Sequence, residues 1–211
     1  MLIENSIKDF INKIDEKTPT PGGGSVSALA SSMGAALVGM VSHLTIEKKK
    51  FLNLDEEIQK KFNETIDFMR RLKNRLATLV DKDSQAYDLV SNAYKLPKDT
   101  DEEKRIRTEA IEKGTLEAIK APYEVAAISL EALNQLKHIV PYGNINTVSD
   151  LGVATLLLAA GGEGACMNVL INLPGLSDEE LKSKFEKDVI EFIKSYDNLK
   201  KEYLKTIYEK I

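Results

Sequence analysis

The sequence predicts an all-α protein, and three observations support this prediction. Two stretches of the chain carry almost no charge, although Asp, Glu, Lys and Arg make up 29% of its 211 residues. The segments around them repeat apolar residues every three or four positions, as amphipathic helices do. No stretch shows the strict alternation that is typical of a half-buried strand. We therefore expect a single domain, residues 1–211, folded as a bundle of about six helices with the two uncharged segments at its centre.

The first uncharged segment contains no Asp, Glu, Lys or Arg between Lys17 and Glu47. It opens with three glycines after Pro21, and we expect them to precede the helix because each Gly costs about 1 kcal/mol there relative to Ala. Ser25 or Ser27 would then cap a helix that runs to Ile46. This helix has no polar face, so the pattern predicts burial on all sides and makes His43 a core histidine.

The second uncharged segment begins near Asn144 or Asn146 and runs to about Leu170. After Asp150, Glu163 is its only charged residue, and Gly and Ala are frequent. Small side chains let neighbouring backbones approach closely. We therefore expect the two segments to pack against each other, or against their copies in a partner chain.

The remaining helices are expected to be amphipathic. Thr100 and Ser177 each begin a capping box, in which Ser or Thr is followed three residues later by Glu. Pro122 should kink its helix or divide it in two. The expected amphipathic helices span residues 3–14, 55–94, 100–138 and 177–210.

Composition and motifs argue against several classes of protein. A net charge of −4 and a pI of about 5.4 are unlike the basic surface that binds nucleic acid. The uncharged segments are long enough to cross a membrane, but they are rich in Ser, Gly and Ala rather than Leu, Ile and Phe, so we expect no membrane span. The chain has no GxxxxGK[ST] or GxGxxG motif of nucleotide-binding folds.

The few cysteines and histidines point to a cytoplasmic protein without a metal. Cys166 is the only cysteine, which fits a reducing compartment, and the first residues lack the apolar core of a signal peptide. His43 and His138 lack the spacing of zinc ligands. We expect no metal and no cofactor.

Asp83 interrupts an apolar stripe in the expected helix 55–94. It lies four residues from Leu79 and four from Tyr87, on the face that should be buried. A lone charge on such a face is costly unless it is paired or hydrogen-bonded. Asp83 is therefore either a functional carboxylate or a structural one that caps a neighbouring helix or pairs with Lys or Arg.

A second group of polar residues marks the start and end of the second uncharged segment. Asn146 and Asp150 lie one helical turn apart, and Asn168 and Asn172 repeat this spacing. Buried amides and carboxylates need hydrogen-bonding partners. A small polar ligand would supply them, and so would caps and hydrogen bonds between helices.

Several of these motifs together resemble the cyclodeaminase domain of formiminotransferase-cyclodeaminase and the stand-alone methenyltetrahydrofolate cyclohydrolases of the same family. The matching segments occur in order along nearly the whole chain. They are Pro21-Gly-Gly-Gly-Ser, Leu44-Thr with Lys48-Lys-Lys-Phe, Asp81-Lys-Asp83-Ser-Gln-Ala-Tyr, Leu96-Pro-Lys, Gly143-Asn-Ile-Asn-Thr-Val-Ser-Asp150 and Asn168-Val-Leu-Ile-Asn172.

The resemblance implies an all-helical homodimer with a folate site near the subunit interface, and an enzyme that acts on a C–N bond of a tetrahydrofolate derivative. It leaves open which of the two reactions the chain catalyses. A non-catalytic folate-binding or scaffold protein is the alternative.

Candidate site residues follow from the motifs. Asp83 and Asp150 are the candidate catalytic residues, and either could instead bind the pterin's guanidine-like edge. The Gly22–Gly24 amides and Lys48–Lys50 could hold the glutamate tail of folate. The expected substrate-binding residues are Gly22, Gly23, Gly24, Ser25, Lys49, Asn144, Asn146, Ser149, Asn168 and Asn172.

Overall fold

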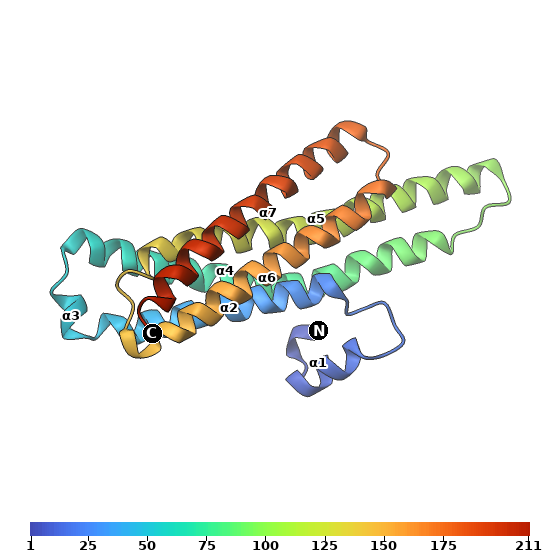
Figure 1. Ribbon diagram of the computed structural model, residues 1–211. Helices are drawn as coiled ribbons and strands as arrows, with labels where there is room; N and C mark the ends of the chain where they lie inside the picture. The colour runs from blue at the N-terminus through green and yellow to red at the C-terminus, as the bar shows by residue number, and fades with distance from the viewer.

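The computed structural model describes all 211 residues and contains helices but no strands (Figure 1). The prediction of an all-α fold is confirmed. The α-helices are α1 (Ile7–Ile14), α2 (Gly23–Ile46), α3 (Lys49–Leu52), α4 (Glu56–Tyr94), α5 (Asp101–Gln135), α6 (Val148–Asn172) and α7 (Glu179–Tyr208). Short 3-10 helices cover η1 (Leu2–Glu4), η2 (Leu136–His138), η3 (Ile145–Thr147) and η4 (Leu173–Gly175).

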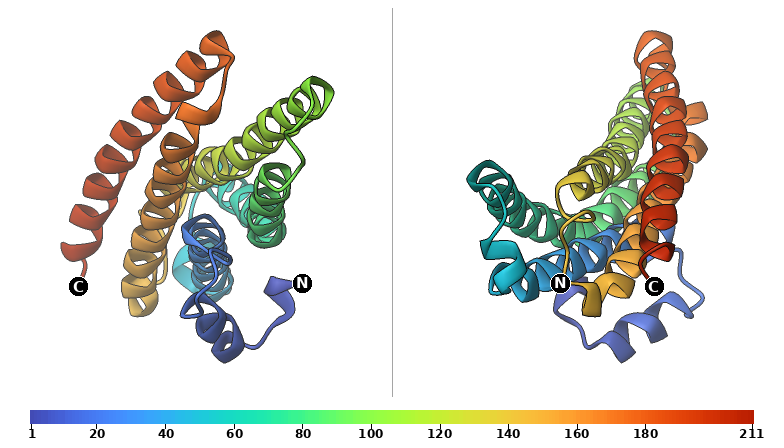
Figure 2. Two further views of the ribbon diagram at one scale, coloured as in Figure 1. Left: turned by 90° about the vertical axis from the view of Figure 1, so that its right-hand side faces the viewer. Right: turned by 60° about the vertical axis from the view of Figure 1, so that its left-hand side comes forward.

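The five long helices form an elongated bundle in which α2 and α6 lie side by side (Figures 1 and 2). Glycines allow this close approach. A β-carbon on Gly34 would lie 2.9 Å from the side chain of Leu158, and one on Gly161 would lie 2.2 Å from Ser31 Oγ. The predicted packing of the two uncharged segments against each other is therefore confirmed. Helices α4 and α5 pack beside this pair, and α7 packs on α6.

The prediction that these two helices are buried on all sides is wrong for the single chain. Their neighbours cover one side only, and each helix exposes an apolar stripe along its length. His43 also lies on the exposed side, so it is not a core histidine. The exposed residues are Val26, Met33, Ala36, Met40, His43 and Leu44 on α2, and Val153, Leu156, Ala160, Met167 and Ile171 on α6. We call this surface the apolar stripe.

By length and hydropathy, two helical stretches could cross a membrane, namely Gly23–Ile46 and Ile145–Gly175. In each, about half of the most apolar part is buried inside the bundle, 56% and 50% respectively. Core helices of soluble bundles have these same properties.

The start of α2 differs from its prediction. The helix begins at Gly23, with Gly22 as N-cap, so Gly23 and Gly24 belong to the helix. The Ser25 hydroxyl does not cap the helix but bonds to α4 instead. Glycine is needed in this first turn because neighbouring side chains occupy the space that a β-carbon would need.

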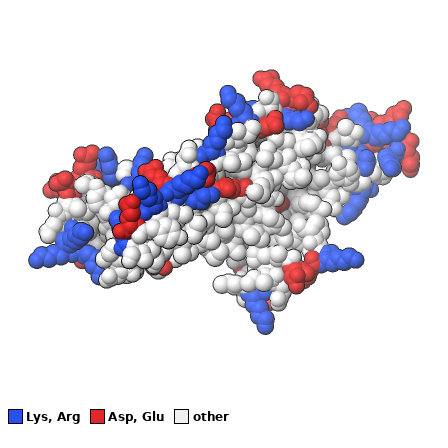
Figure 3. Space-filling view, viewed as in Figure 1, with Lys and Arg blue, Asp and Glu red and all other residues white.

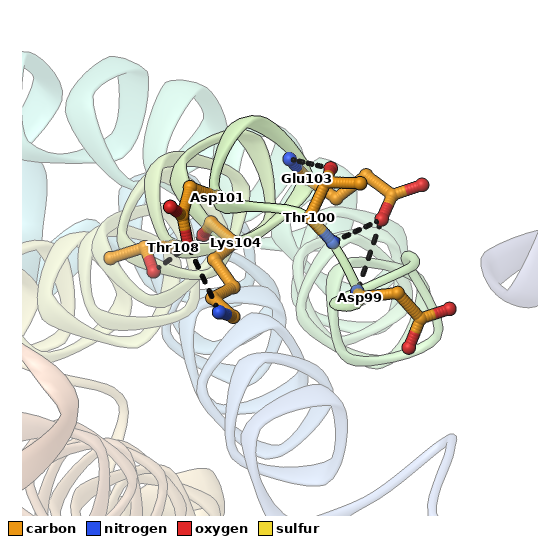
Figure 4. A network of polar contacts seen from close by, with 6 residues as sticks. All are labelled: Asp99, Thr100, Asp101, Glu103, Lys104 and Thr108. Carbon is orange, nitrogen blue, oxygen red and sulfur yellow. Dashed lines mark hydrogen bonds and ion pairs between the residues drawn. The ribbon is translucent and has the colours of Figure 1, made fainter.

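The ends of the other helices match their predictions in most places. At the start of α5, Thr100 Oγ1 accepts from the Glu103 N–H at 3.2 Å, and the Glu103 carboxylate accepts from the Thr100 N–H at 2.8 Å (Figure 4). Pro122 lies inside α5 without dividing it. At α7 the N-cap is Asp178 rather than Ser177, because the Ser177 hydroxyl bonds to Glu112 instead.

Candidate active site

A pocket of about 350 Å³ opens at the N-terminal end of α2, where this helix meets α4, α5 and the end of α6. Five of its twelve lining positions belong to the Gly-rich loop and the first turn of α2, and the others come from α4, α5 and α6. The full lining is Pro19, Thr20, Gly22, Gly23, Gly24, Asp83, Tyr87, Val90, Ala118, Asn168, Ile171 and Asn172. The structure thus brings residues from four distant segments into one site.

Asp83 lies against the first turn of α2. A β-carbon on Gly24 would lie only 2.0 Å from Asp83 Oδ1, so the carboxylate packs directly against the backbone of Gly24. The Ser25 hydroxyl lies 3.0 Å from Asp83 Oδ2 and 2.9 Å from the Val80 carbonyl oxygen, and it can donate to either. The carboxylate therefore lies at the positive end of the α2 dipole.

No cation accompanies this carboxylate. Asp83 forms no ion pair with Lys or Arg. Of the two structural roles considered for it, pairing with a cation is therefore excluded, and capping of a neighbouring helix is left. Burial raises the pKa of Asp83 above its ordinary value of 3.8, while hydrogen bonds from the Ser25 hydroxyl and backbone act in the opposite direction. Its contact with the first turn of α2 is compatible with a capping role and with a functional one.

Asn168 and Asn172 line the pocket and use their side-chain nitrogens within the protein. The Asn168 amide nitrogen donates to the Gly164 carbonyl at 2.8 Å. The Asn172 amide nitrogen donates to the carbonyls of Asn168 at 2.8 Å and Ala118 at 3.4 Å. The two side-chain oxygens accept no hydrogen bond from the protein, so they are free to accept from a ligand. The pocket is consequently rich in acceptors and has no Lys or Arg in its wall.

Six lining residues were not among the predicted site residues, namely Pro19, Thr20, Tyr87, Val90, Ala118 and Ile171. Tyr87 lies on the apolar face of the expected helix 55–94, which we predicted to be buried. Its side chain is instead 42% exposed and lines the pocket. Ile171 is 76% exposed at the pocket mouth. Tyr87 could have been predicted as a pocket residue, because it carries a polar hydroxyl and follows Asp83 by one helical turn.

The other candidate residues lie at the opposite end of α2. Asn144 donates from its backbone to Thr45 Oγ1 at 2.9 Å and from its side chain to the Leu44 carbonyl at 3.2 Å. Asn146 and Ser149 are exposed, and Asp150 is half-buried without a hydrogen bond or ion pair. We call Asn144, Asn146, Ser149 and Asp150 the α6 start cluster. Exposed Lys49, in α3, belongs to this same end of the molecule.

The candidate residues therefore form two groups within one chain. Helix α2 separates them, and its 24 residues span about 36 Å. Gly22–Gly24 and Lys49 consequently cannot hold the same glutamate tail within one chain, contrary to our expectation. Whether Asp150 shares a site with Asp83 depends on what covers the apolar stripe.

Asp81, two residues before Asp83, has a structural role that the sequence did not reveal. Its carboxylate is 8% exposed and accepts hydrogen bonds from the Leu2 N–H at 2.5 Å and the Ile3 N–H at 3.4 Å. It anchors the N-terminal segment to α4. No group of three or more His, Cys, Asp or Glu residues is arranged to hold a metal ion.

The chain is similar to folate enzymes over nearly its whole length. It is 32% identical to the methenyltetrahydrofolate cyclohydrolase of Methylorubrum extorquens, over 98% of this chain and 97% of that protein. It is 34% identical to the formimidoyltransferase-cyclodeaminase of Rattus norvegicus, of which it spans about a third.

A solved structure shows the same fold. The crystal structure of formiminotetrahydrofolate cyclodeaminase from Thermotoga maritima matches with a TM-score of 0.78 and 27% identity, over 100% of this chain and 97% of that one. The formiminotransferase-cyclodeaminase family profile matches residues 6–191. The chain therefore belongs to the formiminotransferase-cyclodeaminase family.

Proposed function

We propose that this chain is a folate one-carbon enzyme that opens or closes a C–N bond at the one-carbon unit of a tetrahydrofolate derivative. The observation that carries the proposal is the half-buried carboxylate of Asp83, which has no cation beside it, in a pocket that also contains the side-chain amides of Asn168 and Asn172. Names of relatives that match the full chain support it, since one is a cyclohydrolase and another a cyclodeaminase.

The chemistry of both reactions fits this pocket. In cyclohydrolysis, water adds to the cationic methenyl carbon, loses a proton, and one C–N bond of the tetrahedral intermediate breaks. In cyclodeamination, a folate N–H nitrogen attacks the carbon of the protonated formimino group and loses its proton. The former imino nitrogen takes up a proton, its C–N bond breaks, and it leaves as ammonia, which gives the methenyl cation. Both reactions pass between an amidinium-like cation and a tetrahedral intermediate, which a nearby carboxylate would stabilise.

Asp83 is the group that we assign to proton transfer. Its pKa is raised by burial, so the carboxyl exchanges a proton closer to neutral pH than a solvated Asp would. It would take the proton of the attacking water in one reaction and deliver a proton to the leaving nitrogen in the other. Asn168 and Asn172 would accept hydrogen bonds from ligand N–H groups.

We also propose a cytoplasmic homodimer. The apolar stripe supports the dimer, because the centre of this face is nearly uncharged whereas charged side chains gather at the bundle ends and along α7 (Figure 3). A free, buried Cys166 supports a reducing compartment, and burial raises its thiol pKa to about 12. Such a thiol is inert at neutral pH.

The test is a spectrophotometric assay with methenyltetrahydrofolate and, separately, with formiminotetrahydrofolate. We expect turnover of at least one of them, and a fall of roughly a hundredfold or more in Asp83→Asn, the usual contribution of a positioned acid or base. Asp88→Asn is the matched control, because Asp88 is an exposed carboxylate in the same helix. Calorimetric folate binding without turnover would instead favour a non-catalytic binding protein.

A further inference from the structure

The Ser25 hydroxyl, where helix α2 meets α4, has more neighbours than its single hydrogen can serve. The Val80 carbonyl oxygen lies 2.9 Å from Ser25 Oγ, Asp83 Oδ2 lies 3.0 Å from it, and Ser84 Oγ lies 3.1 Å from it. A hydroxyl donates one hydrogen and accepts through two lone pairs. Ser25 can therefore donate a full hydrogen bond to Val80 or to Asp83, but not to both.

Ser25 can influence a ligand only through Asp83. Its side chain is 0% exposed and forms no part of the pocket wall, whereas the Asp83 carboxylate lines the pocket. Any contribution of Ser25 to the chemistry is consequently a contribution to the position and the protonation of this carboxylate.

A second serine of α2 shows what the contact with a carbonyl does by itself. Ser32 Oγ, seven residues after Ser25, donates at 3.0 Å to the carbonyl of Lys73, seven residues before Val80. Both serines are buried, and both tie α2 to α4 through a backbone oxygen. Only Ser25 also has a carboxylate and a second hydroxyl within hydrogen-bonding distance. A tie between two helices therefore accounts for Ser32 fully and for Ser25 only in part.

The additional partners of Ser25 match the two protonation states of Asp83. An ionised carboxylate only accepts, so the Ser25 O–H donates to Oδ2. A carboxyl protonated on Oδ2 donates instead, so Ser25 Oγ accepts from it and the Ser25 O–H turns to the Val80 carbonyl. Ser84 can donate to the remaining lone pair of Ser25 Oγ in both arrangements. Only hydrogens turn between the two arrangements, and no heavy atom has to move.

We infer that Ser25 is a positioning residue for proton transfer. Its hydroxyl donates to Asp83 when the carboxylate is ionised and accepts from Asp83 when the carboxyl is protonated, while the Val80 carbonyl receives the Ser25 hydrogen. The inference rests on the proposed function, in which Asp83 gains and loses a proton in each turnover. It adds to that function the group that keeps the carboxylate in one place in both states.

Charged side chains around Asp83 do not compete with Ser25 for this role. Helix α2 has no Asp, Glu, Lys or Arg, and its His43 lies in the last turn, far from Ser25. Tyr87 is the one other titratable side chain in the pocket wall. The causes of the raised pKa of Asp83 are accordingly burial, which raises it, and the bonds from Ser25, which oppose the rise. The remaining charged side chains nearby on the packed helices are engaged elsewhere: Asp81 with Leu2 and Ile3, Lys82 in the groove between α4 and α5, Glu117 with Lys120, and Glu163 with Lys200.

Removal of the Ser25 hydroxyl should move the titration of Asp83 to higher pH. A hydrogen bond to an ionised carboxylate is stronger than one made by the neutral carboxyl. Ser25→Ala therefore destabilises the ionised form more, and the pKa of Asp83 rises. Cyclohydrolysis needs the ionised form as base, so its acid-side limb should move to higher pH. Cyclodeamination needs the protonated form as acid, so its activity should extend to higher pH.

Profiles of kcat and KM against pH test the role in turnover. We expect kcat of Ser25→Ala to fall by roughly tenfold at the wild-type optimum, which corresponds to one charge-assisted hydrogen bond, with KM nearly unchanged. Ser25→Cys fills the same space with a weak donor and acceptor, so its profile should shift in the same direction and separate hydrogen bonding from packing. Ser32→Ala is the matched control, and its profile should coincide with that of wild type.

A titration without substrate separates the inference from the proposed function. The protein is labelled with ¹³C at the aspartate carboxyl carbons, and the Asp83 signal is identified by its absence in Asp83→Asn. We expect a higher titration midpoint for Asp83 in Ser25→Ala than in wild type, and an unchanged midpoint in Ser32→Ala. Circular dichroism checks that each variant is folded, and Ser25→Cys takes the place of Ser25→Ala if the latter does not fold.

Infrared difference spectra recorded below the midpoint test whether Ser25 accepts from the protonated carboxyl. Subtracting the spectrum of Asp83→Asn isolates the carboxyl C=O band of Asp83. We expect this band at a higher wavenumber in Ser25→Ala, because the carboxyl O–H has lost its acceptor. A band at the same position would overturn the alternation of the hydroxyl.

The remaining outcomes distinguish the two claims. Equal Asp83 midpoints in wild type and Ser25→Ala, in a protein that turns over a folate, would overturn the inference and leave the proposed function standing. A raised midpoint in a protein that turns over neither folate would overturn the proposed function and leave the hydrogen-bond alternation standing. A lower kcat with an unshifted pH profile would show that Ser25, like Ser32, only ties α2 to α4, and would overturn the inference.

Discussion

The carboxylate of Asp83 occupies the space beside Gly24 that any larger residue would need. A β-carbon at position 24 would lie 2.0 Å from Oδ1, 2.4 Å from Cγ and 2.7 Å from Oδ2 of Asp83. All three distances are far below van der Waals contact. The absence of a side chain at position 24 is therefore a condition for the position of the carboxylate.

Gly24→Ala should displace Asp83 and lower turnover by roughly a hundredfold, as the loss of a positioned acid or base does. The fold should survive, because Ala is a better helix former than Gly. Steady-state kinetics and circular dichroism measure the two effects. Gly39→Ala in the same helix is the control, since a β-carbon there meets no atom within 4 Å. An unchanged kcat in Gly24→Ala would contradict the assigned role of Asp83.

Asp83 should make the stability of the protein depend on pH in a defined direction. Because burial raises its pKa above 3.8, the folded state binds this proton more tightly than the unfolded state. The contribution of Asp83 to stability is then fully present below the ordinary pKa and is lost as the pH rises through the raised one. Asp83→Asn should therefore gain stability relative to wild type as the pH rises through this window.

Denaturant unfolding of both proteins at a series of pH values checks this. The exposed carboxylate of Asp88 supplies the comparison, because Asp88→Asn should show a nearly constant difference from wild type over the same range. A difference between wild type and Asp83→Asn that does not change with pH would show that burial leaves the pKa of Asp83 unaltered.

Tyr87 should contribute to substrate binding through its ring. It is the one aromatic residue in the pocket wall, and an aromatic pair is worth about 0.5–1.5 kcal/mol beyond area burial, or about a 2- to 12-fold change in affinity. Tyr87→Ala should raise KM by this factor with a smaller effect on kcat, and Tyr87→Phe should restore it. Tyr94→Ala, an exposed aromatic of α4 outside the pocket, should leave KM unchanged.

Gly162→Ala should destabilise the bundle where α6 meets α7. A β-carbon at this position would lie 2.0 Å from the ring of Tyr196, which is fully buried and donates its hydroxyl to the Ala126 carbonyl. Overpacking of this kind costs about 1–3 kcal/mol. Gly152→Ala in the same helix meets Ile207 at an ordinary 3.4 Å and should be neutral or stabilising. Thermal unfolding of the two variants compares them, and equal midpoints would mean that Tyr196 can move away.

Helical spacing of apolar residues was sufficient to predict the amphipathic helices α1, α4, α5 and α7, and the absence of charge was sufficient to predict α2 and α6. The boundaries failed where tertiary contacts decide. Gly23 and Gly24 belong to α2 because Asn168 and Asp83 pack against them. Pro122 lies inside an unbroken α5, so of the two predicted outcomes, a kink or a division of the helix, the division is wrong.

The candidate site was also predictable in part: the sequence identified Asp83 but not which other residues lie near it. Asp83 was found because a charge in an apolar stripe is conspicuous, and the structure surrounds it with Gly24, Ser25, Asn168 and Asn172. The distance between Asp83 and Asp150 could not be predicted, because it depends on how the helices pack. An uncharged helix face also does not reveal whether the chain itself or a second molecule covers it, which is why burial was overestimated for α2 and α6.

One turn of α4 holds both ends of the N-terminal segment. Asp81 binds the backbone of Leu2 and Ile3, and Asp83 binds Ser25. Residues 4–24, which include α1, are thereby held to α4 at both ends, and α4 sets the position of the Gly-rich turn, independently of the length of the chain before it. Doubling the length of a flexible loop costs only about 0.6 kcal/mol in closure entropy. A longer or shorter stretch around Lys13–Lys17 would therefore leave the carboxylate of Asp83 in place in the pocket.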